Sequence, residues 1–192
     1  MINSHRLWEN HFRQFETRDN PSLSAALDAA MQFCLAMGSA TAEPYWLTLL
    51  GPSGTGKTML ARGISRFFAA SLDSLLDENK TTPTARYYRA GGFKAWERVV
   101  ADMLEGDFSG IRDLRDDWFV CLDDIGAEYA RNRDISVSKL YEVLNARERK
   151  FTVITANLTL QDINTKLDAR IASRLLRNGS VVVDVEASDF NL

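Results

Sequence analysis

The chain has few of the residues that bind metals or form cross-links. Its 192 residues include only two cysteines and two histidines. Cys34 and Cys121 both lie among apolar neighbours, which predicts buried, reduced thiols rather than a disulfide or metal ligands. His5 and His11 have no cysteine nearby. A zinc site or a disulfide framework is therefore not expected of this sequence.

Long apolar runs and turn-rich tracts are also missing. No stretch approaches the roughly 18 consecutive apolar residues of a membrane-spanning helix. Met1–Asn10 lacks the cationic-then-apolar order of a signal peptide. Four prolines and eleven glycines leave little room for a disordered tract. We therefore expect a soluble, cytoplasmic protein of one domain, in which residues 1–20 are either an N-terminal extension or the start of the domain.

Strand-like and helix-like segments alternate along the chain. Short apolar or β-branched runs predict strands at Tyr45–Leu50, Ala85–Ala90, Trp118–Leu122, Phe151–Thr155 and Ser180–Val185. Apolar residues three or four apart predict helices at 22–37, Lys57–Ala70, Phe93–Leu104, Ile135–Arg149 (capped by Asp134) and Lys166–Arg177. Residues 71–83 are polar and end in Pro83, which indicates a loop or a frayed helix end. The alternation predicts an α/β fold with a five-stranded parallel sheet and right-handed crossovers.

One octapeptide identifies a ligand. It reads Gly51-Pro52-Ser53-Gly54-Thr55-Gly56-Lys57-Thr58 and lies between a predicted strand and a predicted helix. Its glycines allow the backbone to form a ring of N–H donors around phosphates, and the helix adds the positive end of its dipole. Lys57 is expected to reach the β and γ phosphates, and the Thr58 hydroxyl to ligate Mg²⁺. This P-loop predicts binding of a nucleoside triphosphate with its magnesium.

Polar residues follow two later strands. The apolar strand WFVCL ends in Asp123 and Asp124, where a carboxylate would lie beside the bound Mg²⁺. Asp123 is predicted to face the magnesium through metal-bound water, and Asp124 to polarise or deprotonate the attacking water. Because Asp124 is one methylene shorter than the glutamate often found in such ATPases, slow turnover is expected. Asn157 follows the next strand and is predicted to hold that water or to sense the γ-phosphate, although an Asn after a strand is by itself more often a turn residue.

The last predicted helix presents a row of arginines. Arg170, Arg174 and Arg177 are spaced four and three apart, so they share one face opposite Leu167, Ile171 and Leu175. Like charges at this spacing repel one another unless an anion lies nearby. A solvated face is the alternative. The functional interpretation is an arginine finger offered to the γ-phosphate of a neighbouring subunit.

In this order and spacing, GPSGTGKT, WFVCLDDIGAE, TVITANL and LDARIASRLLRNGS resemble the AAA+ ATPases, and among them the DnaC-type helicase loaders and IstB-type transposition helpers. The resemblance implies a three-layer P-loop NTPase core and an ATP-driven oligomer that binds single-stranded DNA and acts on a partner protein. It also implies Lys57 and Thr58 as Walker A ligands, Asp123 and Asp124 as the Walker B pair, and Asn157 as sensor 1. Arg174 is the implied arginine finger, with Arg170 as a second candidate.

Two departures from the family pattern leave alternatives open. No helical lid domain is expected, because the chain ends soon after its last predicted strand. Only about fifty residues precede the P-loop, so either the chain is an isolated ATPase domain or it has lost the N-terminal module that binds a helicase. The expected partner is a replicative helicase in DNA replication. The alternatives are a transposase or another partner in a transposition or phage ATPase, a switch that hardly hydrolyses ATP, and, less favoured, a small-molecule kinase.

Contacts with single-stranded DNA require a local patch, because the net charge is −3. Residues 86–98 and 129–133 mix cations with aromatics, a mixture that can follow phosphates and stack bases. Region 92–115 resembles the helical insertion that initiator and loader ATPases direct into their central channel. The aromatics there are as readily explained by core packing. The predicted DNA contacts are Lys94, Arg98, Tyr129, Arg131 and Arg133.

Overall fold

A five-stranded parallel sheet forms the centre of the molecule. The computed structural model describes residues 8–39, 43–79, 90–127, 133–177 and 179–189. The strands lie in the order β2-β3-β4-β1-β5, and every neighbouring pair is parallel. Their bounds are β1 Trp46–Leu50, β2 Ala90–Ala95, β3 Phe119–Asp123, β4 Phe151–Ala156 and β5 Val181–Asp184. The predicted α/β fold with five parallel strands is confirmed.

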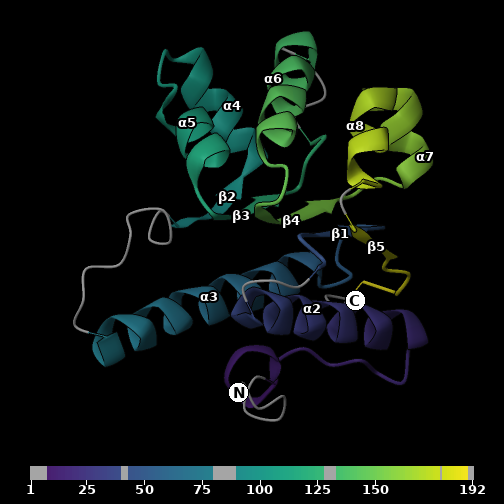
Figure 1. The fold of residues 1–192 in the computed structure, drawn as a ribbon. Helices are drawn as coiled ribbons and strands as arrows, with labels where there is room; N and C mark the ends of the chain where they lie inside the picture. Colours follow the sequence, from purple (N-terminus) through teal and green to yellow (C-terminus); the bar gives the residue numbers. More distant parts are fainter. Residues whose placement is uncertain (1–7, 40–42, 80–89, 128–132, 178, 190–192) are drawn as a thin grey trace.

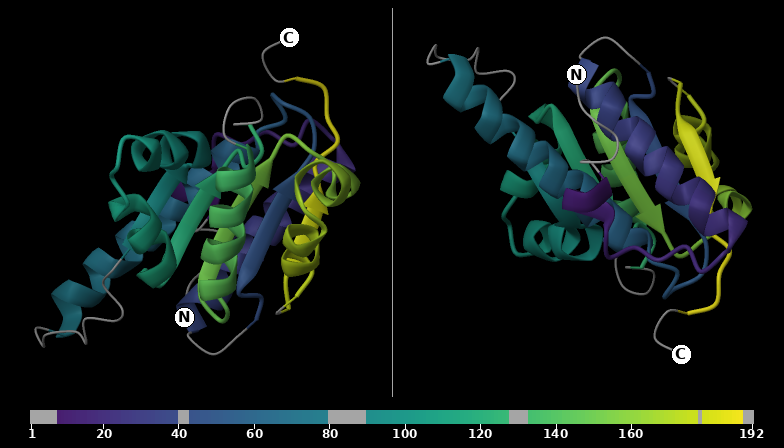
Figure 2. Two further views of the ribbon diagram at one scale, coloured as in Figure 1. Left: turned by 90° about the horizontal axis from the view of Figure 1, so that it is seen from above. Right: turned by 90° about the horizontal axis from the view of Figure 1, so that it is seen from below.

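Helices cover both faces of this sheet (Figure 1). One face carries η1 (Trp8–Phe12), α2 (Pro21–Ser39) and α3 (Lys57–Asn79), and the other carries the remaining helices. These are α4 (Trp96–Leu104), α5 (Ser109–Asp116), α6 (Arg133–Ala146), α7 (Leu160–Asp162), η2 (Ile163–Leu167) and α8 (Ala169–Leu175). Figure 2 shows the sheet first through the second set of helices and then through α2 and α3. The molecule thus has three layers.

Each face of the sheet has its own core. In β1, Leu47 and Leu49 belong to the core under α2 and α3, whereas Trp46 and Leu50 belong to the core under the other helices. Successive side chains of a strand point to opposite faces, so a strand covered on both sides needs apolar residues throughout. This explains why the buried strands read as nearly continuous apolar runs.

The parallel register brings three strand ends to one edge. Leu50, the last residue of β1, pairs with Ala156 at the end of β4, and Leu122 of β3 pairs with Ile154 of β4. The loops that follow β1, β3 and β4 therefore emerge side by side. These loops carry the P-loop, the two aspartates and Asn157. This edge is the place where the predicted site residues can meet.

Several predicted boundaries are wrong. The second strand occupies Ala90–Ala95 rather than Ala85–Ala90, so Phe93–Ala95 extend the sheet and the helix predicted at Phe93 begins at Trp96. Residues 85–89 of the predicted strand lie outside the described residues. α3 continues to Asn79, through much of the segment 71–83 predicted as a loop or a frayed helix end. α6 begins at Arg133, which places Asp134 in its first turn and not at the cap.

The predicted helix Lys166–Arg177 is divided in two. η2 ends at Leu167 and α8 begins at Ala169. Between them Asp168 is extended, with φ −162° and ψ 131°, and its side chain accepts a hydrogen bond from the Arg170 N–H. An N-cap residue needs this extended backbone, so the cap interrupts what the apolar spacing predicts as one helix.

One buried cation connects the segments that precede β3 and β4, at the edge of the sheet opposite the P-loop. The Arg147 side chain is fully buried just after α6 and donates to the carbonyls of Leu114, Asp117 and Phe151. Its Nε donates to the Thr152 hydroxyl at 2.8 Å. Burial lowers the pKa of Arg147 to about 9. Because this pKa is still above neutral, the guanidinium stays charged at neutral pH. Arg147 thus links α5, the start of β3 and the start of β4 through their backbones.

Candidate nucleotide site

The P-loop lies between β1 and α3 in a conformation that its glycines permit. Gly51, Gly54 and Gly56 have φ values of 129°, 78° and 86°. A side chain at Gly51 would lie 2.4 Å from the carbonyl oxygen of Val185, the residue that follows β5. A side chain at Gly56 would lie 2.7 Å from the Phe15 ring. Both positions therefore exclude any larger residue, by backbone conformation and by space.

Lys57 begins α3 with its ammonium group held inside the loop. The residue is 5% exposed, and its Nζ donates to the Pro52 carbonyl and, at 3.2 Å, to the Thr55 hydroxyl. Burial lowers the pKa of Lys57, and the charges of Asp124 and Asp123 oppose that shift. A partly desolvated ammonium beside a ring of backbone N–H groups favours a polyanionic ligand.

Asp123 connects the P-loop to the neighbouring strand. Its Oδ1 accepts one hydrogen bond from the Thr58 hydroxyl at 3.0 Å and another from the Thr155 hydroxyl at 2.7 Å. The predicted magnesium ligand and the predicted magnesium-side carboxylate thus lie in direct contact. Thr155, in β4, is a site residue that the sequence analysis missed, because a threonine within a β-branched strand gives no signal of its own.

Asp124 and Asn157 form the next pair along this edge. The Asn157 side-chain amide donates to Asp124 Oδ1 at 2.7 Å, and the Asp124 backbone N–H donates to the Thr155 hydroxyl at 2.8 Å. Asp124 has a φ of 57°, in the left-handed region that few residues other than glycine, asparagine and aspartate occupy. The structure therefore brings together the residues that the sequence placed after two separate strands.

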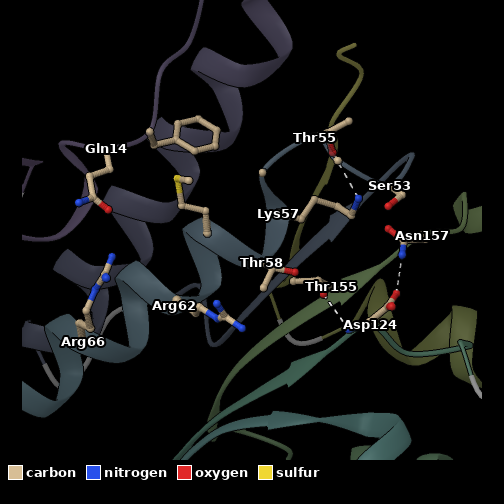
Figure 3. Close-up of a pocket in the computed structure, with 14 residues that line it drawn as sticks. Gln14, Ser53, Thr55, Lys57, Thr58, Arg62, Arg66, Asp124, Thr155 and Asn157 are labelled. Carbon is tan, nitrogen blue, oxygen red and sulfur yellow. Dashed lines mark hydrogen bonds between the residues drawn. The ribbon is translucent and has the colours of Figure 1, made fainter. Parts of the chain in front are cut away.

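These residues line one cavity of about 590 Å³ (Figure 3). Its lining includes the P-loop residues from Ser53 to Thr58 together with Asp124, Thr155 and Asn157. Figure 3 shows Ser53, Lys57, Asp124 and Asn157 gathered at one end, with Gln14 and Arg66 at the other. The cavity is long enough to extend well past the phosphate-binding loop.

The far end of this cavity comes from segments that the sequence analysis did not assign to the site. Gln14 and Phe15, in the connection between η1 and α2, line it together with Met59, Arg62 and Arg66 of α3. Arg62 also lies over the Phe93 ring, 5.1 Å from its centre. The N-terminal segment therefore contributes to the site directly.

The chain also matches a family of known proteins. Residues 47–178 match the family model for the ATPase family associated with various cellular activities (AAA). That segment begins in β1, ends after α8, and contains the P-loop, both aspartates and Asn157. The chain belongs to the AAA family.

Solved structures share the fold of this AAA domain. A proposed primosome component from Streptococcus pyogenes serotype M3 has a TM-score of 0.64 and 20% identity over 95% of this chain and 89% of its own. DnaI has a TM-score of 0.58 and 19% identity, covering 96% and 92%. The DnaC helicase loader has a TM-score of 0.58 and 22% identity, covering 94% and 99%. The comparison with curated protein sequences gives no match.

The predicted resemblance to AAA+ ATPases with a DnaC-like fold is thereby confirmed. In the part of the chain that the structure describes, no helix follows β5, so no lid is seen there. Nor does any helix within the described ranges have the length and hydropathy needed to cross a membrane.

The arginines of α8 lie outside the nucleotide cavity of their own AAA domain. Ile171 and Leu175 of α8 are buried, as predicted, whereas Arg170 is exposed and Arg174 is half-buried. Arg170 pairs with Asp168, with Nη2 2.8 Å from Oδ2, and its guanidinium lies 4.7 Å from the centre of the Tyr141 ring.

Tyr141 of α6 also interacts with the second arginine. Hydrogen bonding by Asn145 and Arg174 lowers the pKa of the Tyr141 hydroxyl. Arg170 therefore interacts with both Asp168 and Tyr141 of its own chain, whereas Arg174 interacts with Tyr141.

Two of the cations predicted to contact DNA lie near acidic groups. Lys94 lies 3.9 Å from Asp113, and Arg98 forms an ion pair with Asp102 at 2.7 Å. Arg133 donates to the carbonyl of Lys166. Tyr129 and Arg131 lie outside the described residues.

Proposed function

We propose that this AAA protein binds ATP with Mg²⁺ in the 590 Å³ cavity and hydrolyses it. The contact of Thr58 and Thr155 with the same oxygen of Asp123 is the observation that carries the proposal. A hydroxyl and a carboxylate held together at the start of a P-loop helix form the oxygen-rich environment that Mg²⁺ prefers. The P-loop N–H groups and Lys57 hold the phosphates, Thr58 ligates the ion, and Asp123 binds it through water.

Asp124 and Asn157 are the residues proposed to act on the attacking water. Bound Mg²⁺ supplies charge neutralisation on the phosphates, and these two side chains orient the water against them. The Asn157 side-chain amide donates to Oδ1 of this half-buried carboxylate, so the two side chains lie in contact at the end of the cavity that holds Lys57. The short side chain at 124 supports slow hydrolysis.

We place the second half of the site on a neighbouring copy. The half-buried Arg174 of α8 is proposed to reach the γ-phosphate bound by the next subunit, and its absence from the lining of the nucleotide cavity of its own chain supports a role in trans. Arg170 remains the second candidate. Its pairing with Asp168 makes it the less available of the two.

The biological role that we propose is that of a replicative helicase loader acting with single-stranded DNA. The fold shared with the DnaC helicase loader and with DnaI supports this role. Lys94, Arg98 and Arg133 remain the proposed DNA contacts, together with Tyr129 and Arg131. Phosphates would exchange with the carboxylates that Lys94 and Arg98 contact, because exposed ion pairs contribute little to stability.

The described N-terminal residues are proposed to be an integral part of a single AAA domain. Phe15 is buried against Gly56 of the P-loop, and Gln14 lines the nucleotide cavity. Residues 8–20 are therefore proposed to help form the nucleotide site. They do not form a separate module that could bind the partner.

Hydrolysis measured with mixed subunits tests the proposal. Lys57→Ala and Arg174→Ala should each be inactive alone, because one cannot bind ATP and the other cannot donate its arginine. Their mixture should regain activity at the sites where a functional P-loop faces a functional arginine. Normal hydrolysis by Arg174→Ala alone, with no gain on mixing, would show that the site is complete within one chain. A pull-down that recovers a transposase and no helicase would favour the transposition role.

A further inference from the structure

The connection between α4 and α5 exposes two large apolar side chains. Leu104 is 48% exposed and Phe108 is 52% exposed. Glu105 and Asp107 lie between them, and both are exposed. We refer to residues 104–108 as the acidic tip. A single exposed apolar residue is ordinary on a protein surface, but two on one turn flanked by carboxylates form a small contact surface.

The charge of the acidic tip itself disfavours nucleic acid. Residues 104–108 contain two acidic residues, Glu105 and Asp107, and no basic residue. Exposed carboxylates repel phosphates, so the tip is suited to a partner surface that is apolar and basic.

A surface of that kind lies at the other side of the same chain. An open groove of about 790 Å³ runs between α7 and α8, lined in part by Leu160, Ala172, Leu176 and Arg177. Leu176 is 59% exposed and Arg177 is also exposed. Residues 160–177 contain four basic and two acidic residues. The groove therefore shares the apolar character of the tip and has the opposite sign of charge.

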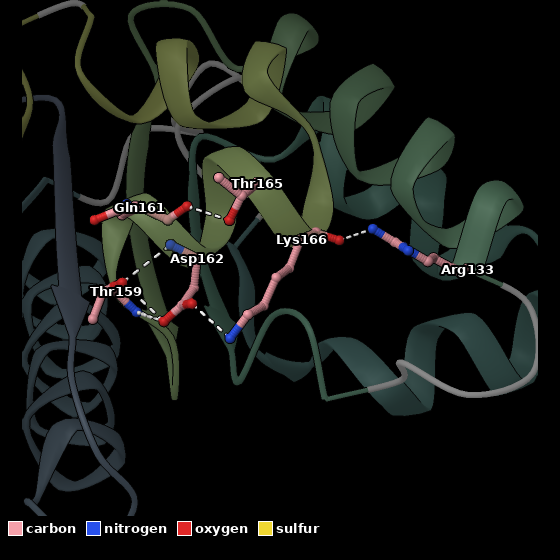
Figure 4. Close-up of polar contacts among 6 residues, drawn as sticks. All are labelled: Arg133, Thr159, Gln161, Asp162, Thr165 and Lys166. Atoms are coloured by element: carbon pink, nitrogen blue, oxygen red, sulfur yellow. Dashed lines mark hydrogen bonds and ion pairs between the residues drawn. The ribbon is translucent and has the colours of Figure 1, made fainter.

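Polar contacts hold one wall of the groove in place (Figure 4). The Thr159 hydroxyl and the Asp162 carboxylate form a reciprocal capping box at the start of α7. Lys166 pairs with the same carboxylate at 2.6 Å, and Arg133 of α6 donates to the Lys166 carbonyl. A groove whose wall is already ordered costs little conformational entropy when a partner binds.

The two surfaces cannot meet within one chain. α4 and α5 lie over the β2 side of the sheet, α7 and α8 lie toward its β5 side, and α6 stands between them (Figure 1). A second copy placed beside the first can bring its groove to the tip. Because the surfaces differ, such a contact is head-to-tail and can repeat from copy to copy.

We propose that the acidic tip of one copy docks in the α7–α8 groove of the next copy, with Phe108 against Leu176 and the carboxylates of the tip near Arg177. This inference rests on the self-association in the proposed function and names the surfaces that form it. The α8 helix that supplies the groove also carries Arg174, so the contact would orient that arginine toward the neighbouring copy.

Sedimentation velocity of the full chain with Mg²⁺ and a non-hydrolysable ATP analogue tests the contact. Phe108→Asp disables the tip and Arg177→Glu disables the groove, both at exposed positions. Each should weaken self-association about tenfold or more, because an apolar contact or a charge pair is lost. Ile135→Asp is the matched control, since Ile135 is 50% exposed and belongs to neither surface. It should assemble like the wild type.

Mixing the two disabled variants gives the decisive result. Each retains one functional surface, so the mixture should form a dimer that does not grow further. Assembly of Phe108→Asp equal to that of Ile135→Asp would overturn the inference, as would a mixture that stays monomeric. A Phe108→Asp protein that assembles like the wild type but no longer binds oligothymidine would also overturn the inference, because it would assign the tip to nucleic acid.

The same variants separate this inference from the trans arginine. Arg174→Ala that assembles normally but does not hydrolyse ATP supports both ideas. Normal hydrolysis by Arg174→Ala, with assembly still lost in Phe108→Asp, removes the trans arginine and keeps the docking surface. Loss of hydrolysis in Arg174→Ala, together with normal assembly of Phe108→Asp, removes the docking surface and keeps the trans arginine.

Discussion

Replacing Thr155 with valine should damage the magnesium site while keeping the shape of β4. The Thr155 hydroxyl donates to Asp123 Oδ1 at 2.7 Å and accepts from the Asp124 N–H at 2.8 Å. The residue is 1% exposed, so water cannot readily replace either bond. Thr155→Val substitutes a methyl group for the hydroxyl at nearly the same volume. It removes both hydrogen bonds at once.

The expected loss follows from these two bonds. A hydrogen bond to a charged group contributes roughly 1.5–3 kcal/mol, and an unsatisfied buried N–H costs roughly 1–3 kcal/mol. Because neighbouring effects are not additive, we expect about 2–4 kcal/mol of lost folding stability. At about 2–4 °C for each kcal/mol in a chain of this size, the Tm should fall clearly. A carboxylate that loses such a supporting contact typically holds its metal roughly 10 to 100 times more weakly.

Thr152→Val is the control for this substitution. Thr152 lies in the same strand and is fully buried, and its hydroxyl also makes two hydrogen bonds. It accepts from Arg147 Nε at 2.8 Å and donates to the Lys150 carbonyl at 2.9 Å. Both variants should lose stability. Only Thr155→Val should need more Mg²⁺ for ATP hydrolysis, when hydrolysis is titrated with Mg²⁺ below the Tm of both proteins.

An equal magnesium requirement in the two variants would refute the reasoning. It would mean that Thr155 stabilises β4 without orienting Asp123 for the ion. A Thr155→Val protein as stable as the wild type would refute the estimate from the other side, because it would show that both hydrogen bonds are replaced.

Three further outcomes follow from contacts at the site and in the core. Burial lowers the pKa of Lys57, so as pH rises its ammonium loses its proton at a lower pH than an ordinary lysine does. The affinity for ATP, measured in binding titrations, should therefore begin to decline at that lower pH. Lys57→Arg should flatten this decline. Asn157→Ala should slow hydrolysis on the order of 10²-fold with ATP affinity nearly unchanged, because only the Asp124 contact is lost; equal losses in both quantities would contradict this role. Arg147→Met should lower the free energy of unfolding by roughly 3 kcal/mol or more in urea titrations, because it leaves buried carbonyls without donors; a loss under about 0.5 kcal/mol would show that the Arg147 contacts are not needed.

Elements with one strong local signal were predicted well from sequence. The P-loop, the strand before the two aspartates and the strand before Asn157 combine an apolar run with polar residues at its end. That combination specifies both the element and its place at the edge of a parallel sheet. The buried side of α8 follows in the same way from Ile171 and Leu175.

Elements that depend on contacts distant in sequence were predicted with the wrong bounds. β2 contains Gly91 and Gly92, with a bulge between Ala90 and Gly92, and gains its strand form by pairing with β3. Its sequence alone resembles a turn before a helix. The break at Asp168 was hidden for a similar reason, because a cap requires an extended backbone that apolar spacing does not reveal.

The parts of the site that were missed lack a chemical signature. Thr155 and Gln14 are common residue types, and only the fold brings them to the P-loop. Arg147 was missed because an arginine near the end of a predicted helix is normally exposed, whereas here four acceptors from three segments surround it.

The positive φ of Asp124 bears on how the proposed ATP hydrolysis could be made faster. Lengthening the acid to glutamate is the obvious change, since a longer side chain reaches farther toward water. At a φ of 57°, however, the backbone accepts aspartate or asparagine far more readily than glutamate. The loop and the acid must therefore change together, and the short carboxylate is the one that this turn admits. Slow turnover would then be a property of the backbone after β3, and faster relatives should differ there in loop conformation as well as in the acid.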